Sequence, residues 1–246
     1  MKILYFLIIF VNIFFISCAI DDDMGNIRQI VMNTVMQDMP YNFDGRMDHV
    51  RSFIQKVTVS KSTTFDVHDI NGMLKGISST IENDTPPIST LCGHRAKIFE
   101  FIAEQLGYRT RWINTYTDTS TDNILLGHVF NEVMGYDGLW YIVDSDLDIY
   151  YKKDDRRLGI EEAIVTPFLE YSPYNELFGN GWDITPSTQN LFDYDYFRAV
   201  LIRDKLSVDK VIFTNRFNYN KVFTCIGTTA IKYFRDECNF NIIILP

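Results

Sequence analysis

One stretch in the middle of the chain constrains the fold more than any other feature. Two short runs of β-forming residues, His128–Met134 and Leu139–Asp144, flank the turn-forming sequence Gly135-Tyr136-Asp137-Gly138. This pattern predicts a tight antiparallel hairpin. A three-residue turn at 135–137 places His128 directly opposite Asp144, and opposed side chains have Cβ atoms about 4.5–5.5 Å apart. A four-residue turn makes the two residues diagonal neighbours, which still permits contact.

The chain before the hairpin is predicted to be largely helical. Apolar residues recur at three- and four-residue steps. The segments with this spacing are Ile27–Met36, Met47–Val57 and Phe65–Ile81. The sequence Asn83-Asp84-Thr85-Pro86-Pro87 ends the third helix. A fourth helix begins at Cys92 and ends before Gly107, which has the position of a C-terminal cap.

The remaining segments predict an α+β fold with one domain. Thr110–Thr115 is predicted to be a strand and Ile160–Val165 a short helix. Further strands are predicted at Val211–Phe217, Lys221–Ile226 and Phe240–Leu245. We therefore expect a domain over residues 27–170 and a β-rich C-terminal extension, residues 171–246, that packs on the same domain.

The N-terminal residues predict export. Met1-Lys2 precedes an apolar run, Ile3–Ile16, and a small residue stands before Cys18. These are the parts of a secretory signal, here residues 1–17, followed by an acidic linker at 18–26. The sequence ending in Cys18 resembles a bacterial lipobox, which implies that Cys18 is lipidated. The alternative is an uncleaved membrane anchor. Either interpretation places the chain on the extracytoplasmic side, in the periplasm or on the cell surface.

The charge of the chain argues against nucleic acid as a partner. The formal net charge is −9, and the densest basic cluster is Lys152-Lys153 with Arg156-Arg157. A surface of this sign repels phosphate backbones. The hydrophobic content of 46% is that of a globular protein with a substantial core.

The cysteines single out Cys92. In an oxidising compartment Cys225 and Cys238 are close enough in sequence to form a disulfide, which leaves Cys92 as the odd thiol beside Cys18. Such a thiol is either a buried inert side chain or a nucleophile. At the start of a helix, open N–H groups and the positive end of the macrodipole favour a thiolate and can bind an oxyanion.

A thiolate nucleophile needs an imidazole partner, and His128 is the best candidate. His94 is two residues beyond Cys92 and points away from it on a helix. His49 and His68 are predicted to have surface or capping roles. His128 alone has a carboxylate at a predictable position, Asp144, which can orient its ring.

The same residues resemble a known superfamily. Leu91-Cys92-Gly93-His94-Arg95-Ala96, with Leu-Gly and an Arg-containing strand at 106–111, resembles the nucleophile helix of the transglutaminase-like superfamily. His128–Val133 is similar to its His strand and Trp140–Asp144 to its Asp strand. The resemblance implies a papain-like core, in which a helix bearing the Cys packs on an antiparallel sheet bearing the His and Asp. It also implies a thiol acyl-transfer enzyme with Cys92, His128 and Asp144 as the catalytic triad.

For exported bacterial members, the resemblance favours a cysteine protease or amidase that hydrolyses peptide or amide bonds in the cell envelope over amine transfer. No metal or organic cofactor is expected, because a Cys-His-Asp zinc site lacks a fourth ligand. The superfamily commonly adds a side-chain oxyanion donor upstream of the Cys. Gln29, Gln37 and Gln55 are the candidates here, and the role stays open.

A second function class also fits the sequence. In this alternative the fold is a non-catalytic envelope module that binds a glycan, a peptide or a partner protein. Its binding groove would use aromatic residues of the C-terminal part, namely Tyr171, Tyr174, Phe178 and Trp182. The polar loop Tyr116–Asn123 is a predicted wall of the cleft in either case.

Overall fold

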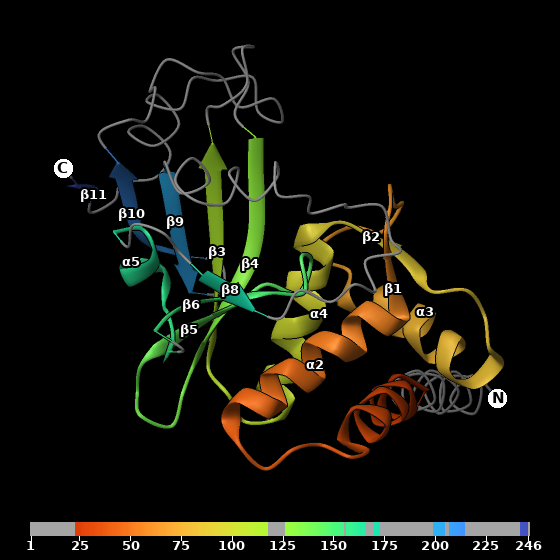
Figure 1. The fold of residues 1–246 in the computed structure, drawn as a ribbon. Coiled ribbons are helices and arrows are strands. Elements are labelled where there is room, and N and C mark those ends of the chain that lie inside the picture. The colour runs from red at the N-terminus through yellow and green to blue at the C-terminus, as the bar shows by residue number, and fades with distance from the viewer. Residues whose placement is uncertain are drawn as a thin grey trace, which may run out of the picture.

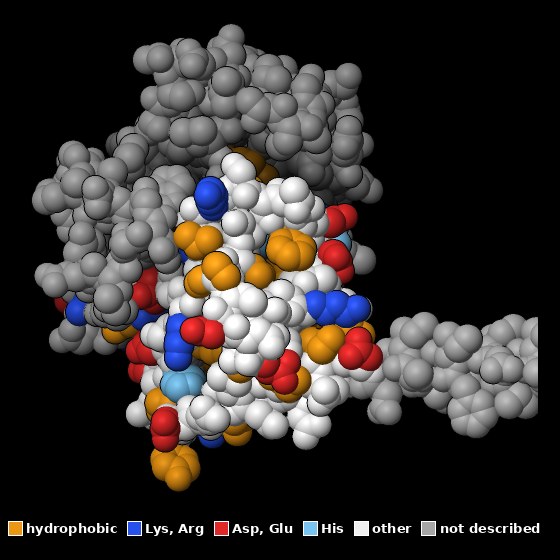
Figure 2. All heavy atoms as spheres, turned by 90° about the vertical axis from the view of Figure 1, so that its right-hand side faces the viewer, with side chains coloured by type: hydrophobic (Ala, Val, Ile, Leu, Met, Phe, Trp, Pro, Cys, Tyr) orange, Lys and Arg blue, Asp and Glu red, His pale blue; other side chains and the backbone are white. Residues whose placement is uncertain are grey.

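A computed structural model describes residues 23–117, 126–154, 156–165, 170–172, 199–204, 207–214 and 242–245. These residues form a mixed α+β fold with a largely antiparallel sheet, as the sequence predicts. In Figure 1 the long helices gather on one side and the main sheet stands on the other. On the helical side, the described acidic and basic side chains are interspersed, as Figure 2 shows.

The long helices of the described part lie close to the predicted positions. The described residues 23–36 are helical, and they are followed by α2 (Phe43–Val57), α3 (Ile70–Asn83) and α4 (Cys92–Gln105). Asn42 and Asp69 cap α2 and α3, because their side chains accept hydrogen bonds from the N–H groups of Gly45 and Gly72. Beyond α4, Gly107 has a φ of +84° and takes the left-handed conformation that ends a helix.

The main sheet has six described strands. In spatial order they are β11 (Ile242–Leu245), β10 (Ser207–Thr214), β9 (Ala199–Asp204), β3 (Thr110–Thr117), β4 (Leu126–Met134) and β5 (Trp140–Val143). Neighbours are antiparallel except β10 and β11, which are parallel. Because β9 pairs with β3, the described strands of the C-terminal region continue the sheet that holds the hairpin.

Two smaller sheets are not predicted by the sequence, because runs of two to four residues are too short to show a period. In one, β1 (Thr58–Ser60) pairs in parallel with β2 (Ile88–Thr90). In the other, β6 (Tyr150–Lys153) lies between β7 (Arg156–Arg157) and β8 (Glu170–Ser172). The first matters for the site: Lys61 donates its N–H to the carbonyl of Thr90 at 3.0 Å, which fixes the backbone two residues before Cys92.

Two hydrophobic cores lie on opposite faces of β4. Val133 belongs to the core that packs the long helices together, whereas Phe130 belongs to a core shared with Ile142 and the short helix α5 (Ile160–Ala163). Residues of odd and even number on a strand point to opposite faces, so one strand serves both cores. His128 shares the face of Phe130, and their ring centroids are 5.7 Å apart.

The hairpin is present, but its predicted register is wrong. Met134 pairs with Trp140, so the strands are displaced by two residues from the register that sets His128 directly opposite Asp144. The three-residue loop is 136–138 instead of 135–137, since the N–H of Gly135 donates to the carbonyl of Leu139 at 2.8 Å. Gly138, with a φ of +79°, supplies the left-handed residue that closes such a loop. His128 and Asp144 are therefore diagonal neighbours.

Several predictions concern residues outside the described ranges. They are the signal segment 1–17 and Cys18, the disulfide between Cys225 and Cys238, most of the loop Tyr116–Asn123, the strand Lys221–Ile226, and the aromatic residues Tyr174, Phe178 and Trp182. Among the described helices, none has the length and apolar character needed to cross a membrane.

Candidate active site

Cys92 is the first residue of α4, immediately after β2. Its thiol is free and its side chain is partly exposed. The N-cap residue, Leu91, makes no side-chain capping hydrogen bond. The open N–H groups and the positive end of the helix dipole therefore lie at the sulfur, and both favour negative charge there.

The ring of His128 connects Cys92 to a carboxylate. Its side chain is buried at 5% exposure, and Nε2 lies 2.7 Å from Oδ2 of Asp144. The sulfur of Cys92 lies within 4.8 Å of a nitrogen of the same ring and contributes to the raised pKa of His128. Since Nε2 bonds to Asp144, we assign the contact with the sulfur to Nδ1. The predicted contact between His128 and Asp144 is thus confirmed, across a diagonal instead of a directly opposed pair.

Asp144 is held by the turn that follows β5. Its side chain is fully buried, and Oδ1 accepts hydrogen bonds from the N–H groups of Asp146 at 3.1 Å and Leu147 at 3.0 Å. Backbone hydrogen bonds in both directions between Asp144 and Ile149, at 3.0 and 3.1 Å, close the turn. One carboxylate oxygen therefore fixes the turn while the other orients the imidazole.

Three alternate aspartates in this turn each pair with a different cationic side chain. Asp144 contacts His128 of β4. Asp146 lies 3.3 Å from Arg95 of α4, and Asp148 lies 3.0 Å from Arg51 of α2. All of these side chains are buried. The network joins two helices and a strand to one turn, and only its first pair is predicted by the sequence.

The surroundings of His128 favour its protonated form. Burial lowers the pKa of His128, but attraction to Asp144, the hydrogen bond between them and smaller contributions from Cys92 raise it well above the ordinary value of 6.5. Burial raises the pKa of Asp146, against the opposing effects of His128 and Arg95. The surroundings therefore favour an imidazolium beside the sulfur.

Asp144 controls this protonation, which an NMR titration can test. We expect the ring protons of His128 to titrate with a midpoint well above pH 6.5, so that the imidazolium persists as the pH rises past neutrality. In an Asp144→Asn variant the largest raising influence is removed while burial remains, so the midpoint should fall. A midpoint that is the same in both proteins would contradict the assignment of Asp144 as the partner.

The other histidines have structural contacts, in line with the predictions. His94 points away from the thiol: its Nε2 bonds to the carbonyl of Phe65 at 2.9 Å. His49 contacts the carbonyl of Val35 at 2.9 Å, at the end of the first helix, and His68 is exposed.

Among the three glutamines considered as oxyanion donors, Gln55 reaches the turn that carries the aspartates. Its Nε2 donates to the carbonyl of Ser145 at 2.5 Å and lies 3.3 Å from the carbonyl of Asp146. These bonds occupy the amide N–H groups, so Gln55 supports the turn instead of facing a substrate. Gln29 is exposed on the first helix, and Gln37 lines a distant pocket.

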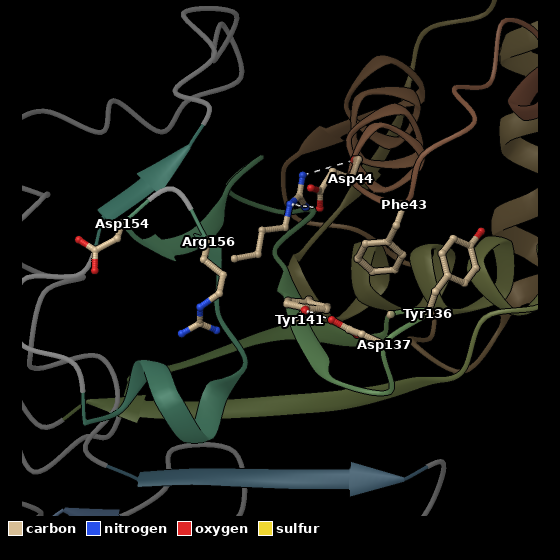
Figure 3. Close-up of a pocket in the computed structure, with 9 residues that line it drawn as sticks. Phe43, Asp44, Tyr136, Asp137, Tyr141, Asp154 and Arg156 are labelled. Atoms are coloured by element: carbon tan, nitrogen blue, oxygen red, sulfur yellow. Dashed lines mark hydrogen bonds and ion pairs between the residues drawn. The ribbon is translucent and has the colours of Figure 1, made fainter.

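Two pockets formed by described residues lie elsewhere. One, with a volume of about 500 Å³, lies beside the hairpin loop and is lined by Phe43, Tyr136 and Tyr141 together with charged residues (Figure 3). The other, of about 590 Å³, lies among the first helix, α2 and α3. Neither is lined by Cys92, His128 or Asp144, so neither is the site of the chemistry proposed below.

The comparisons with known proteins give no assignment. No family model matches the chain, and no curated protein is significantly similar to it. A functional interpretation therefore depends on the geometry around Cys92.

Proposed function

We propose that this chain is a thiol acyl-transfer enzyme with a transglutaminase-like, papain-like core, in which Cys92, His128 and Asp144 form the catalytic triad. The observation that carries the proposal is the continuous contact from Asp144 through the buried ring of His128 to Cys92. A nucleophile, a base and a group that orients the base are the three elements of such a site.

In the first step the Cys92 thiolate attacks the carbonyl carbon of a carboxamide or peptide bond. A carbon–sulfur bond forms and the carbonyl electrons move onto oxygen. The N–H groups at the start of α4 receive no side-chain cap and supply donors for this oxyanion. The imidazolium of His128 then protonates the leaving amine as the carbon–nitrogen bond breaks, and an acyl-enzyme remains.

In the second step the neutral imidazole accepts a proton from water, which attacks the thioester and releases the carboxylic acid. Attack by an amine instead of water would make the enzyme a crosslinking transferase. We propose hydrolysis, and hence a protease or amidase with a peptide or protein substrate. In the same proposal the chain is exported and held at the extracytoplasmic face of the membrane by lipidated Cys18.

The proposal can be tested without knowing the substrate, by alkylation of Cys92 with iodoacetamide. In an ion pair the proton lies on the imidazole, so the thiolate persists at acid pH. We expect the rate to stay nearly constant from about pH 5 to pH 8, whereas a free thiol with a pKa of about 8.5 slows roughly tenfold per pH unit below that value. Peptide mapping by mass spectrometry assigns the label to Cys92.

His128→Ala is the decisive variant in this experiment. It should restore the profile of a free thiol and slow alkylation at about pH 5 by at least tenfold. The exposed His68→Ala variant is the matched control and should keep the profile of the unaltered protein. If Cys92 of the unaltered protein already follows the profile of a free thiol, the catalytic proposal fails.

A further inference from the structure

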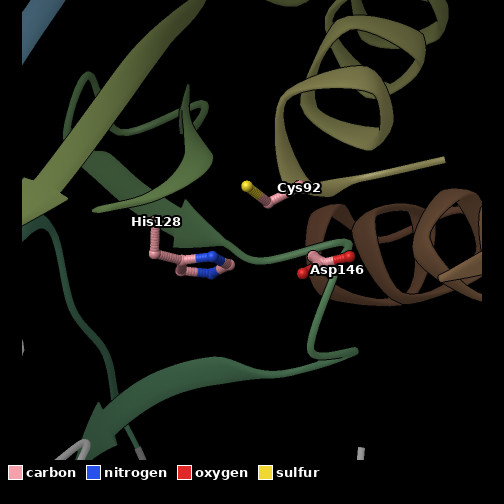
Figure 4. Close-up of side chains that lie close together, drawn as sticks. All are labelled: Cys92, His128 and Asp146. Carbon is pink, nitrogen blue, oxygen red and sulfur yellow. The ribbon is translucent and has the colours of Figure 1, made fainter. Parts of the chain in front are cut away.

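A second carboxylate, from Asp146, lies against the proposed nucleophile and base. One ligand atom each from Cys92, His128 and Asp146 lie within 4.8 Å of one another. In Figure 4 one oxygen of Asp146 points toward the ring of His128, and the side chain of Cys92 lies nearby at the start of α4. The sequence favours Asp144 as the acidic member of this group, but the carboxylate of Asp144 is already used by the ring and the turn.

We propose that Cys92, His128 and Asp146 form a three-ligand site for Zn²⁺ that blocks the nucleophile when it is occupied. Thiolate, imidazole and carboxylate are the side chains that bind zinc in proteins. With zinc bonds of about 2.0–2.3 Å, a tetrahedral site needs ligand atoms roughly 3.3–3.6 Å apart. The ligand atoms are therefore at most roughly 1.5 Å too far apart, a difference that small rotations of the Cys92 and Asp146 side chains would close, with water in the fourth position.

The surrounding hydrogen bonds fit this use of the imidazole. A histidine that binds zinc through one nitrogen usually donates its other N–H to a carboxylate, which fixes the ring. Nε2 of His128 already makes this bond to Asp144 at 2.7 Å, and Nδ1 faces the sulfur. Oδ1 of Asp146 is buried, contacts Arg95 at 3.3 Å and accepts no hydrogen bond. The carboxylate of Asp146 therefore keeps an oxygen lone pair that no hydrogen bond uses.

The charges of the site also favour a divalent cation. Cys92 and His128 together carry no net charge, whichever of them holds their proton, so Asp144 and Asp146 with Arg95 leave the group with one net negative charge. When Zn²⁺ binds, the imidazolium proton leaves to solvent and the metal adds two positive charges. The buried group then becomes neutral, which lowers the electrostatic cost of burial.

Metal binding itself does not depend on the proposed function, but inhibition does. A thiolate whose lone pair is bound to zinc cannot attack a carbonyl, so occupancy would make the enzyme zinc-sensitive. Binding and alkylation are therefore measured separately on the full-length chain. Failure of the acyl-transfer proposal appears in the metal-free alkylation profile, and failure of the zinc proposal appears in the binding data.

The experiment is a Zn²⁺ titration in competition with a chromophoric chelator, accompanied by Co²⁺ absorption spectra. We expect one zinc per chain at this site, a thiolate-to-cobalt charge-transfer band, and protection of Cys92 from iodoacetamide. Asp146→Asn should weaken zinc binding at least about tenfold, and Cys92→Ala should weaken it at least about 100-fold and abolish the band. His68→Ala should change neither.

Two results would overturn the proposal. One is zinc affinity that is equal in the unaltered chain, Asp146→Asn and Cys92→Ala, which would place the metal elsewhere. The other is that iodoacetamide alkylates Cys92 as fast with zinc bound as without it. If Asp146→Asn does not fold, Cys92→Ala and the cobalt band still test the zinc site. The side chain of Cys92 is partly exposed, so shortening it removes no buried charge.

Discussion

Replacing Asp144 with asparagine should abolish the acid-stable alkylation of Cys92 while leaving the fold almost intact. The amide oxygen can still accept the N–H groups of Asp146 and Leu147, so the turn keeps its bonds. The amide NH₂ group then faces Nε2 of His128 and cannot accept its proton. The ring is therefore held with its proton on Nδ1, so the nitrogen beside the sulfur can no longer accept the proton of the thiol. Acyl transfer should fall by about 10²–10⁴-fold.

Asp144→Ala provides the matched comparison, because it removes the orienting group and the bonds of the turn together. It leaves two backbone N–H groups without their acceptor, each at a cost of about 1–3 kcal/mol. Both variants should show the alkylation profile of a free thiol, but only Asp144→Ala should lose more than about 2 kcal/mol in urea unfolding. If Asp144→Asn retains rapid alkylation at acid pH, the imidazole does not depend on Asp144 and the triad is wrong.

The sequence predicts the parts of the site that depend on local pattern. The helix that begins at Cys92, its end at Gly107 and the hairpin between β4 and β5 each follow from spacing and turn chemistry over a few residues. The register of the hairpin does not follow from the local pattern. Gly135 and Gly138 stand at the two ends of the turn sequence, and either can be the glycine of a three-residue loop. The contact between His128 and Asp144 survives the error, since directly opposed and diagonal residues share one face of the sheet.

The ion-pair network is beyond this kind of prediction. Arg51 and Arg95 lie 97 and 51 positions before their partners, so no local pattern connects them to Asp148 and Asp146. A signal exists only in retrospect: Arg51 lies in the buried stripe of α2 beside Met47, Val50 and Ile54. A charged residue at such a position needs a buried partner, and the alternating aspartates after β5 provide it.

The largest loss of stability is expected at the far end of this network, on substitution of Arg51 by methionine. Arg51 is 1% exposed, and it is paired with Asp148 at 3.0 Å and Asp48 at 3.1 Å. Methionine has similar length but takes the guanidinium of residue 51 away from the buried carboxylate of Asp148. Removal of one partner from a buried ion pair costs about 3–5 kcal/mol, which denaturant unfolding measures directly.

Two further variants show whether the stability lost in Arg51→Met comes from the uncompensated charge or from lost side-chain packing. In the double variant Arg51→Met with Asp148→Asn, the buried charge is gone, and about half of the lost stability should return. Asparagine suits the left-handed backbone at 148, where φ is 55°. The exposed pair of Arg156 and Glu162 is the matched control, since Arg156→Met should change the free energy of unfolding far less than Arg51→Met. An equally small loss at Arg51 would show that the network does not hold the turn that carries Asp144 in place, and Asp144 would then depend on its own turn alone.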